Sequence, residues 1–396
     1  MKAGLLGRTL GHSLSPQIHR FFGDYEYRLY EKEPEEVEGF LQETLAAPVG
    51  EDADGTEGLG FLNVTIPYKQ TVFELCDELS PMARKLGNVN FVTRTAGGKL
   101  RGDNTDAFGV GRLLEANGID VRGWNCAILG AGGAAMTVKA VLEERGAKRV
   151  TFVRRGEEPA QDDDLIVNAT PVGMFPDVDG VRVDISQYVS SKAVLDLVYN
   201  PSPTRLVHEA LACGKIAADG MVMLIAQAYR AFRLSQSNNQ TIEQSNNLFL
   251  YGPPASGKST WAKRIAAATG WALVDLDAEI VKAAGRSIPE IFEQEREKGF
   301  REIEKRCLFS ICGDETSPPQ GGRVIALGGG ALLDPESRKI AEAAGRVVVL
   351  DCPIETLKAR ITGGDRPLSA DTAKLEALVR SRAAHYASFP RQVKMI

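Results

Sequence analysis

The hydrophobic positions of this chain form short apolar runs that alternate with longer amphipathic stretches. In the first hundred residues this alternation predicts strands at 2–6, 61–65 and 90–95, and helices at 15–22, 34–46 and 69–76. Strands that alternate with helices are typical of α/β folds with parallel sheets. We therefore expect an α/β protein from the start of the chain.

The same alternation continues as far as residue 234. It predicts strands at 125–129, 150–153, 165–169 and 194–198, and helices that begin near Gly133 and Met221. Only residues 154–164 separate the second of these strands from the third, and three consecutive aspartates lie among them. We expect a loop there, where parallel strands are usually connected by a helix.

A polar tract at 235–247, rich in Ser, Asn and Gln, interrupts the pattern. Such a composition cannot bury a core and predicts a flexible linker. An apolar run begins again at Leu248. We therefore divide the chain into a first domain (1–105), a second (106–234) whose last helix at 221–234 packs back on the first, the linker, and a third domain (248–396).

Composition narrows the class of protein. The 396 residues are 43% hydrophobic and 25% charged, as in soluble globular proteins, and the net charge of −5 argues against nucleic acid as a partner. No apolar segment is long enough to span a membrane. Six scattered cysteines without a C-x-x-C pair indicate reduced thiols in a cytoplasmic protein, and the four histidines form no zinc pattern. The sequence leaves open whether the chain forms a homodimer.

The strongest chemical signal follows the apolar run at 248–251. Gly252-Pro-Pro-Ala-Ser256-Gly257-Lys258-Ser259-Thr260 is a complete phosphate-binding loop between a predicted strand and a predicted helix. Its glycines let successive N–H groups face phosphate oxygens, and the helix adds its positive end. Lys258 can reach the β- and γ-phosphates of ATP, and the Ser259 hydroxyl can bind Mg²⁺.

A second glycine-rich turn, Gly130-Ala131-Gly132-Gly133-Ala134-Ala135, follows a predicted strand and opens a helix. It is the Gly/Ala form of the dinucleotide-binding fingerprint, in which the glycines admit a pyrophosphate. After the next strand, where an NAD site usually has an acidic residue, stand Arg154 and Arg155. Guanidinium groups suit a 2′-phosphate, so NADP is favoured over NAD; the alternative is a pair of solvated surface arginines.

Four segments of the first domain carry a resemblance to a known family. They are Ser13-Leu-Ser15-Pro16, Asn63-Val-Thr65-Ile-Pro67-Tyr-Lys69, Asn88-Val-Asn90 and Asn104-Thr105-Asp106. In this order they resemble shikimate dehydrogenase, and the resemblance extends over about residues 1–234. Ala107 stands where that family usually has a glycine.

The resemblance implies a role for each motif. The carboxylate of a cyclohexene substrate would be bound by Ser13, Ser15 and Thr65, and its hydroxyls by Asn90 and Gln227. Lys69 would donate a proton to the ketone oxygen as hydride arrives, charge-paired with Asp106. Leu197 and Gly220 would line the nicotinamide, and Tyr199 the substrate. The alternative is that Lys69 and Asp106 form only a surface salt bridge; the position of Lys69 in a motif with Asn63 and Thr65 argues against it.

The phosphate-binding loop alone would also suit a nucleoside monophosphate kinase. It is followed by Asp275-Leu-Asp277, Phe300-Arg301-x-x-Glu304, Gly328-Gly329-Gly330, Arg366-Pro-Leu and Arg382-x-x-x-Tyr386. In order and spacing, this series resembles shikimate kinase over about residues 248–390.

This second resemblance also assigns residues. It implies that shikimate is bound by Asp277, Arg301, Gly329, Gly330 and Arg382, with Asp277 orienting the attacking hydroxyl. ATP would be held by Gly252, Ser256, Gly257, Lys258, Ser259, Thr260 and Arg360, and Mg²⁺ by Ser259 and Asp275. Arg366 would reach the transferring phosphoryl group from a lid at 362–372. The family usually ends with a further strand and helix, whereas residues 391–396 suffice only for the strand.

The two resemblances share one metabolite. Together they imply a bifunctional enzyme of the shikimate pathway, and thus of chorismate and aromatic amino-acid biosynthesis, which uses NADPH to make shikimate and ATP to phosphorylate it. The alternatives are a quinate/shikimate dehydrogenase fused to a kinase, and a ligand-sensing module with one degenerate half. The sequence leaves open whether the short segment at 154–164 and the missing helix reduce either activity, and whether the sites communicate.

Overall fold

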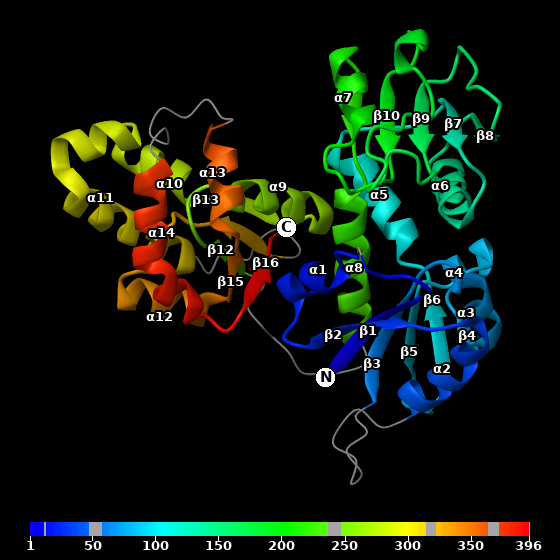
Figure 1. Ribbon diagram of the computed structural model, residues 1–396, viewed down its shortest axis with the longest axis horizontal. Coiled ribbons are helices and arrows are strands. Elements are labelled where there is room, and N and C mark those ends of the chain that lie inside the picture. The colour runs from blue at the N-terminus through cyan, green and yellow to red at the C-terminus, as the bar shows by residue number, and fades with distance from the viewer. Residues whose placement is uncertain (12, 47–57, 237–246, 314–321, 363–371, 396) are drawn as a thin grey trace. The chain divides into compact units, whose positions relative to one another are not determined.

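The computed structural model describes residues 1–11, 13–46, 58–236, 247–313, 322–362 and 372–395. Its internal contacts divide the chain into two compact units, Met1–Thr241 and Ile242–Ile396 (Figure 1). The expected linker is shorter than predicted, because helix α8 (Met221–Gln236) includes Ser235 and strand β12 (Asn247–Tyr251) begins at Asn247. The rest of the predicted linker, 237–246, lies outside the described residues.

The first sheet of the N-terminal unit has six strands in the order β2-β1-β3-β5-β6-β4. Their bounds are β1 (Lys2–Gly7), β2 (Glu26–Glu31), β3 (Leu59–Val64), β4 (Glu78–Leu79), β5 (Phe91–Arg94) and β6 (Leu100–Asp103). β5 runs antiparallel to both β3 and β6, so the expectation of parallel strands is wrong here. The tight turn at 95–99, closed by a hydrogen bond from Gly98 N to Thr95 O, permits only an antiparallel pair.

Five helical segments accompany this sheet, namely α1 (Ser15–Phe22), the 3₁₀ turn η1 (Pro34–Glu36), α2 (Val37–Ala46), α3 (Lys69–Leu75) and α4 (Pro81–Leu86). The α2 helix places Val37, Phe40 and Leu41 against the apolar face of β3, where Leu62 and Val64 are buried. The remaining face of β3 carries Phe61, which packs with Phe91 and Ala231 of α8. Apolar side chains on alternate positions of β3 thus bury both faces of the strand.

The second sheet of this unit is fully parallel, with the order β11-β10-β9-β7-β8. Its strands are β7 (Asn125–Leu129), β8 (Arg149–Val153), β9 (Leu165–Asn168), β10 (Ala193–Asp196) and β11 (Ile216–Ala218). The connecting helices are α5 (Asp106–Ala116), α6 (Gly133–Glu144) and α7 (Arg205–Ala212), with a 3₁₀ turn η2 (Ile185–Gln187). Helices α5 and α8 lie side by side and connect the two sheets (Figure 1).

The connection from β8 to β9, residues 154–164, contains no helix, as expected. Arg149 closes its far end, because the guanidinium forms ion pairs with Asp162 at 2.7 Å and with the buried Asp163 at 2.9 Å. The sheet face on this side is covered by a later segment: Val183, Ile185 and Tyr188 pack with the apolar side chains of β7 and β9. The short connection therefore leaves the sheet intact.

The C-terminal unit contains a parallel sheet in the order β13-β14-β12-β15-β16. Besides β12, its strands are β13 (Ala272–Asp275), β14 (Arg323–Ala326), β15 (Arg346–Asp351) and β16 (Gln392–Lys394). Its helices are α9 (Lys258–Thr269), α10 (Leu276–Ala284), α11 (Ile288–Gly313), α12 (Pro335–Ala344), α13 (Ile354–Thr362) and α14 (Thr372–Ala387). Helices cover both faces of the sheet (Figure 1), and Phe249 and Tyr251 of β12 point to the face covered by α10, α11, α12 and α14.

His19 of α1 is fully buried beside the first sheet. Its ring stacks on Tyr27 at 4.0 Å, and Nδ1 shares a hydrogen bond with the Tyr25 hydroxyl at 2.6 Å. Burial lowers the pKa of His19 to about 3, because the charged ring would lose its hydration. The folded unit therefore favours the neutral ring.

We expect this histidine to make the N-terminal unit less stable in acid. A lowered folded pKa contributes stability that is present above the unfolded value and lost as pH falls, so the loss between pH 7 and pH 5 should be about 2 kcal/mol. Hydrogen exchange of N-terminal peptides at both pH values measures it. His19→Gln should flatten this dependence, whereas His208→Gln, at an exposed position, should keep it; equal slopes in wild type and His19→Gln would contradict the prediction.

Candidate active sites

Lys69 and Asp106 form an ion pair where two helices begin. Lys69 is the first residue of α3, and Asp106 is the first residue of α5. Lys69 Nζ donates to Asp106 Oδ2 at 2.5 Å, and the two side chains are 22% and 13% exposed. Since an ammonium group has three hydrogens, one paired with a single carboxylate can still donate to a substrate oxygen.

Buried amide and hydroxyl groups, most of them from the motifs that contain or adjoin this pair, form a hydrogen-bonded network. Asn90 accepts the Thr105 backbone N–H through Oδ1 at 2.7 Å and donates from Nδ2 to Thr105 Oγ1 at 3.1 Å. Thr105 Oγ1 in turn donates to Gln227 Oε1 at 3.4 Å. The structure therefore brings together Asn90 and Gln227, which are far apart in sequence, through a threonine to which sequence reasoning assigned no role.

The same network continues toward the first strands. Asn63 donates from Nδ2 to the Asn90 carbonyl at 3.3 Å and accepts from the Tyr27 hydroxyl at 3.0 Å. Tyr27 also shares a hydrogen bond with Ser15, a buried residue at the start of α1. Asn63 and Tyr27 are further residues that sequence reasoning left without a role, although Asn63 opens the motif that contains Lys69.

Ser13 and Thr65, which were predicted to bind the substrate carboxylate with Ser15, form hydrogen bonds to residues close by in the sequence. Ser13 Oγ accepts the Ser15 backbone N–H at 3.2 Å, and Thr65 follows β3 with its carbonyl accepting the Tyr68 N–H at 2.9 Å. Both side chains are half-buried. Among the described residues, no hydrogen bond joins Ser13, Ser15 or Thr65 to Lys69.

The turn between β7 and α6 fits a dinucleotide pyrophosphate. Gly130 has φ of 101°, which an L side chain rarely adopts, and its N–H donates to the Val153 carbonyl at 2.9 Å. A Cβ built at Gly132 or Gly133 would meet no atom within 4 Å, so the start of α6 is open to an approaching anion. Ala131 and Ala134 complete this turn, and Arg154 and Arg155 are exposed at the adjoining end of β8.

At the same carboxyl edge of this sheet, on the side of β10 and β11, lie Leu197, Tyr199 and Gly220. Gly220 packs directly on the backbone, since a Cβ there would lie 2.2 Å from the Leu197 carbonyl oxygen. Asp196 organises the strand end by accepting hydrogen bonds from the Val198 N–H and the Thr204 hydroxyl, which explains why β10 stops before residue 198. Burial raises the pKa of Asp196 to about 6 and also raises the pKa of Tyr199.

In the C-terminal unit, the loop between β12 and α9 has the geometry of a phosphate cradle. Gly252 and Gly257 have φ of 132° and 92°, and a Cβ at Gly252 would lie 2.8 Å from the Leu350 carbonyl oxygen. Lys258 Nζ donates to the carbonyls of Gly252 and Pro253 at 2.9 and 2.7 Å. Ser256 Oγ is buried and has no hydrogen-bond partner within the described structure, so the loop suits an added anion.

Two further groups adjoin this loop. Ser259 Oγ donates to Asp275 Oδ2 at 3.3 Å, and a hydroxyl beside a carboxylate is a donor set that Mg²⁺ accepts. Arg360 Nη1 donates to the Ala255 carbonyl at 3.3 Å, so this side chain reaches the loop from α13. Thr260 is exposed in the first turn of α9.

The residues predicted to bind the substrate of this unit gather around Gly328–Gly330. Arg382 Nη1 and the Tyr386 hydroxyl both donate to the Gly329 carbonyl, at 3.1 and 2.7 Å. A Cβ at Gly330 would lie 2.6 Å from Arg301 Nη2, and one at Gly328 would lie 3.6 Å from Asp277 Oδ1. Arg366 and the proposed lid, apart from Thr362 and Thr372 at the ends of α13 and α14, lie outside the described residues.

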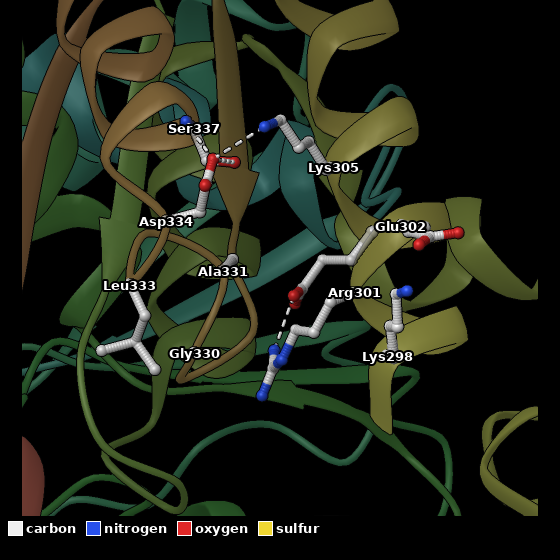
Figure 2. A pocket seen from close by; sticks show the side chains of 10 residues that line it. Lys298, Arg301, Glu302, Lys305, Gly330, Ala331, Leu333, Asp334 and Ser337 are labelled. Atoms are coloured by element: carbon white, nitrogen blue, oxygen red, sulfur yellow. Dashed lines mark hydrogen bonds and ion pairs between the residues drawn. The ribbon is translucent and has the colours of Figure 1, made fainter. Parts of the chain in front are cut away.

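Figure 2 shows a pocket of about 460 Å³ beside Arg301, between α11 and the residues that precede α12. Arg301 Nη1 donates to Glu304 Oε2 at 2.6 Å, and Lys305, also on α11, forms an ion pair with Asp334 on the opposite wall at 3.1 Å. Glu304 is 3% exposed, its Oε1 has no partner among described residues, and burial raises its pKa. Sequence reasoning quoted Glu304 in a motif without giving it this part in orienting Arg301.

The described helices include none that is long and apolar enough to cross a membrane. The same part of the chain holds no cluster of three or more histidine, cysteine, aspartate or glutamate residues suited to a metal ion. None of the six cysteines forms a disulfide.

Comparison with known proteins decides the family. The family model of the shikimate dehydrogenase substrate binding domain matches residues 5–92, and that of shikimate kinase matches residues 254–394. A shikimate dehydrogenase (NADP(+)) from Methanopyrus kandleri is 36% identical over 278 residues, covering 61% of this chain and 91% of that protein. The chain belongs to the shikimate dehydrogenase family. It also carries a shikimate kinase domain, in the order expected for a fusion.

Solved structures agree with this assignment of the dehydrogenase unit. A chorismate mutase/shikimate 5-dehydrogenase fusion protein from Clostridium acetobutylicum has a TM-score of 0.54 and 30% identity, covering 61% of this chain and 92% of that one. Shikimate 5-dehydrogenase from Thermus thermophilus, solved in complex with NADP(H) and shikimate, has a TM-score of 0.53 and 31% identity over 60% of this chain and 94% of that one. Both enzyme activities and the α/β fold are therefore supported.

We expect Gly220→Ala to damage the dehydrogenase unit. The added methyl group would collide with the Leu197 backbone, so the unit should lose about 1–3 kcal/mol of stability and bind its nicotinamide cofactor more weakly. Residual dehydrogenase activity after stepwise heating measures the stability. Gly39→Ala is the control, because a Cβ at this helical position meets nothing within 4 Å; equal heat tolerance of both variants would refute the expectation.

Proposed function

We propose that the N-terminal unit reduces 3-dehydroshikimate to shikimate with NADPH, and that the kinase domain transfers the γ-phosphoryl group of ATP to the 3-hydroxyl of shikimate. The observation that carries the first reaction is the Lys69–Asp106 pair at 2.5 Å, partly exposed beside a buried polar network. The named relatives support the choice of substrate and cofactor, since one is called NADP(+)-dependent and another was solved with NADP(H) and shikimate.

In this proposal the residues 1–105 hold the substrate and 106–234 hold the cofactor. Ser13, Ser15 and Thr65 donate to the substrate carboxylate, while Asn90 and Gln227 bind its hydroxyls. The nicotinamide, when bound, supplies a hydride to the carbonyl carbon. Lys69 gives a proton to the carbonyl oxygen, and Asp106 fixes the direction of the ammonium by accepting one of its hydrogens.

The kinase reaction depends on position and charge. Asp277 orients the 3-hydroxyl, and Arg301 and Arg382 bind the shikimate carboxylate through planar guanidinium groups. Glu304 holds the Arg301 guanidinium at 2.6 Å, so the substrate meets a side chain whose orientation is already set. Lys258 and Arg366 offset charge on the transferring group, and Ser259 with Asp275 holds Mg²⁺. Both reactions would take place in the cytoplasm.

Two lysine variants test whether each unit carries out one of the two reactions. Lys69→Ala should lower NADPH-dependent reduction of 3-dehydroshikimate by about 10²–10⁴-fold, because general acid catalysis typically contributes that much. Shikimate-dependent ADP release should stay unchanged in this variant. Lys258→Ala should lower shikimate-dependent ADP release and leave NADPH-dependent reduction of 3-dehydroshikimate unchanged. Loss of both activities in either variant, with the fold intact by circular dichroism, would contradict the proposal.

Arg301→Lys tests the carboxylate site of the kinase. A lysine keeps the charge but loses the planar fork, so the KM for shikimate in the kinase assay should rise about 10–100-fold. The KM for ATP should change little. Arg306→Lys is the matched control on the same helix, because Arg306 is exposed. An unchanged KM for shikimate would remove Arg301 from the proposed site.

A further inference from the structure

The end of strand β8 lies directly beside the glycine-rich turn of the dehydrogenase unit. Val153, the last residue of β8, pairs with Leu129 of β7, and its carbonyl accepts the Gly130 N–H at 2.9 Å. In folds of this kind, residues just after the second strand meet the adenosine ribose. An acidic side chain there accepts the 2′-hydroxyl of NAD, whereas an arginine accommodates the 2′-phosphate of NADP.

This chain places both kinds of side chain in one tight turn, Arg154-Arg155-Gly156-Glu157. The Glu157 N–H donates to the Arg154 carbonyl at 3.0 Å, and Gly156 supplies the left-handed backbone with φ of 89°. Arg182 holds the turn from behind, because its Nη2 donates to the carbonyls of Arg154 and Glu157 at 2.7 and 2.9 Å. The turn therefore has a defined shape although it is exposed.

Within this turn the Glu157 carboxylate occupies a particular position. Its Oε2 accepts the Arg154 backbone N–H at 2.8 Å, which is the first N–H after the strand. Neither Arg154 nor Arg155 forms an ion pair with any described residue, so the carboxylate is held by the backbone and not by a guanidinium. The next carboxylate, Glu158, points away from the Arg154 amide: it accepts the Tyr188 hydroxyl at 2.6 Å and lies 4.0 Å from Arg182 Nη1.

We propose that Glu157 is a specificity-determining residue that limits the preference of this dehydrogenase for NADP(H) over NAD(H). A carboxylate fixed at the Arg154 amide repels a 2′-phosphate and offers an acceptor to a 2′-hydroxyl, while Arg154 and Arg155 favour the phosphate. The two effects oppose each other, so the unit binds both dinucleotides. This inference rests on the proposed dehydrogenase function, and the tight turn at 154–157 is what brings Glu157 back to the strand end.

The test is calorimetric titration of the full chain with NADP⁺ and with NAD⁺, which needs no turnover. Glu157→Gln removes the charge and keeps the shape, so the ratio of NADP⁺ to NAD⁺ affinity should rise about tenfold. Arg154→Ala should lower the same ratio. Glu158→Gln is the matched control, because this neighbouring carboxylate is bound to Tyr188, and it should leave the ratio unchanged.

The outcomes separate this inference from the proposed function. If wild type binds both dinucleotides and Glu157→Gln keeps the same ratio, the role of Glu157 is refuted and the dehydrogenase assignment stands. If Glu157→Gln and Glu158→Gln raise the ratio equally, general surface charge decides selectivity and Glu157 has no special part. If the chain binds neither dinucleotide, the proposed dehydrogenase function fails together with this inference.

Discussion

The hydrogen bonds between Asn90 and Thr105 are the constraint on which the dehydrogenase site depends. Asn90 binds both the backbone N–H and the hydroxyl of Thr105, the residue immediately before α5. This fixes where α5 begins and therefore where Asp106 lies relative to Lys69. Both Asn90 and Thr105 are buried, and a buried amide left without partners would be costly. The same threonine contacts Gln227, so α8 is tied to the site as well.

In the kinase domain, a backbone carbonyl group positions the helix that carries site residues. The Gly329 carbonyl accepts hydrogen bonds from Arg382 and Tyr386, so α14 is attached to the loop that follows β14. Glycine is needed at 330 because the Arg301 guanidinium occupies the space that a side chain would fill. Glu304 then holds that guanidinium from the buried side. Charged groups on two separate helices, α11 and α14, are thus set before any substrate arrives, which lowers the cost of ordering them.

The short connection after β8 shows how a reduced element can change a site. The alignment with the Methanopyrus relative has 278 positions yet covers 61% of this chain, so it includes positions at which this chain has no residue. Arg149 and Arg182 bind the two ends of the remaining loop, and the sheet face is closed by residues 181–188. The loop is therefore a tight turn at the strand end, and its acidic residue lies where the cofactor ribose is expected.

Local pattern determined much of this protein. The strands and helices that the alternation of apolar runs predicted lie within a few residues of observed ones, although β2, β4, β6 and β11 of the N-terminal unit were not predicted. The two glycine-rich turns could be located because their backbone conformations require glycine at fixed spacings. Lys258 was located through the phosphate-binding loop, whereas Lys69, Asp106 and Arg301 were assigned through motifs that resemble those of two known families. The antiparallel placement of β5 was missed, because the sequence analysis predicted neither β6 nor the tight turn at 95–99 that joins it to β5.

Only the tertiary structure decided how distant polar groups meet. Tyr27, Asn63 and Thr105 join the network of Asn90 and Gln227 through hydrogen bonds between residues far apart in sequence. Glu304 orients Arg301 because it is buried against that side chain. Glu157 is fixed at the end of β8 because its carboxylate accepts the Arg154 amide. Sequence spacing records which residues are neighbours along the chain, whereas burial and hydrogen bonding depend on packing across the fold, and no local pattern specifies them.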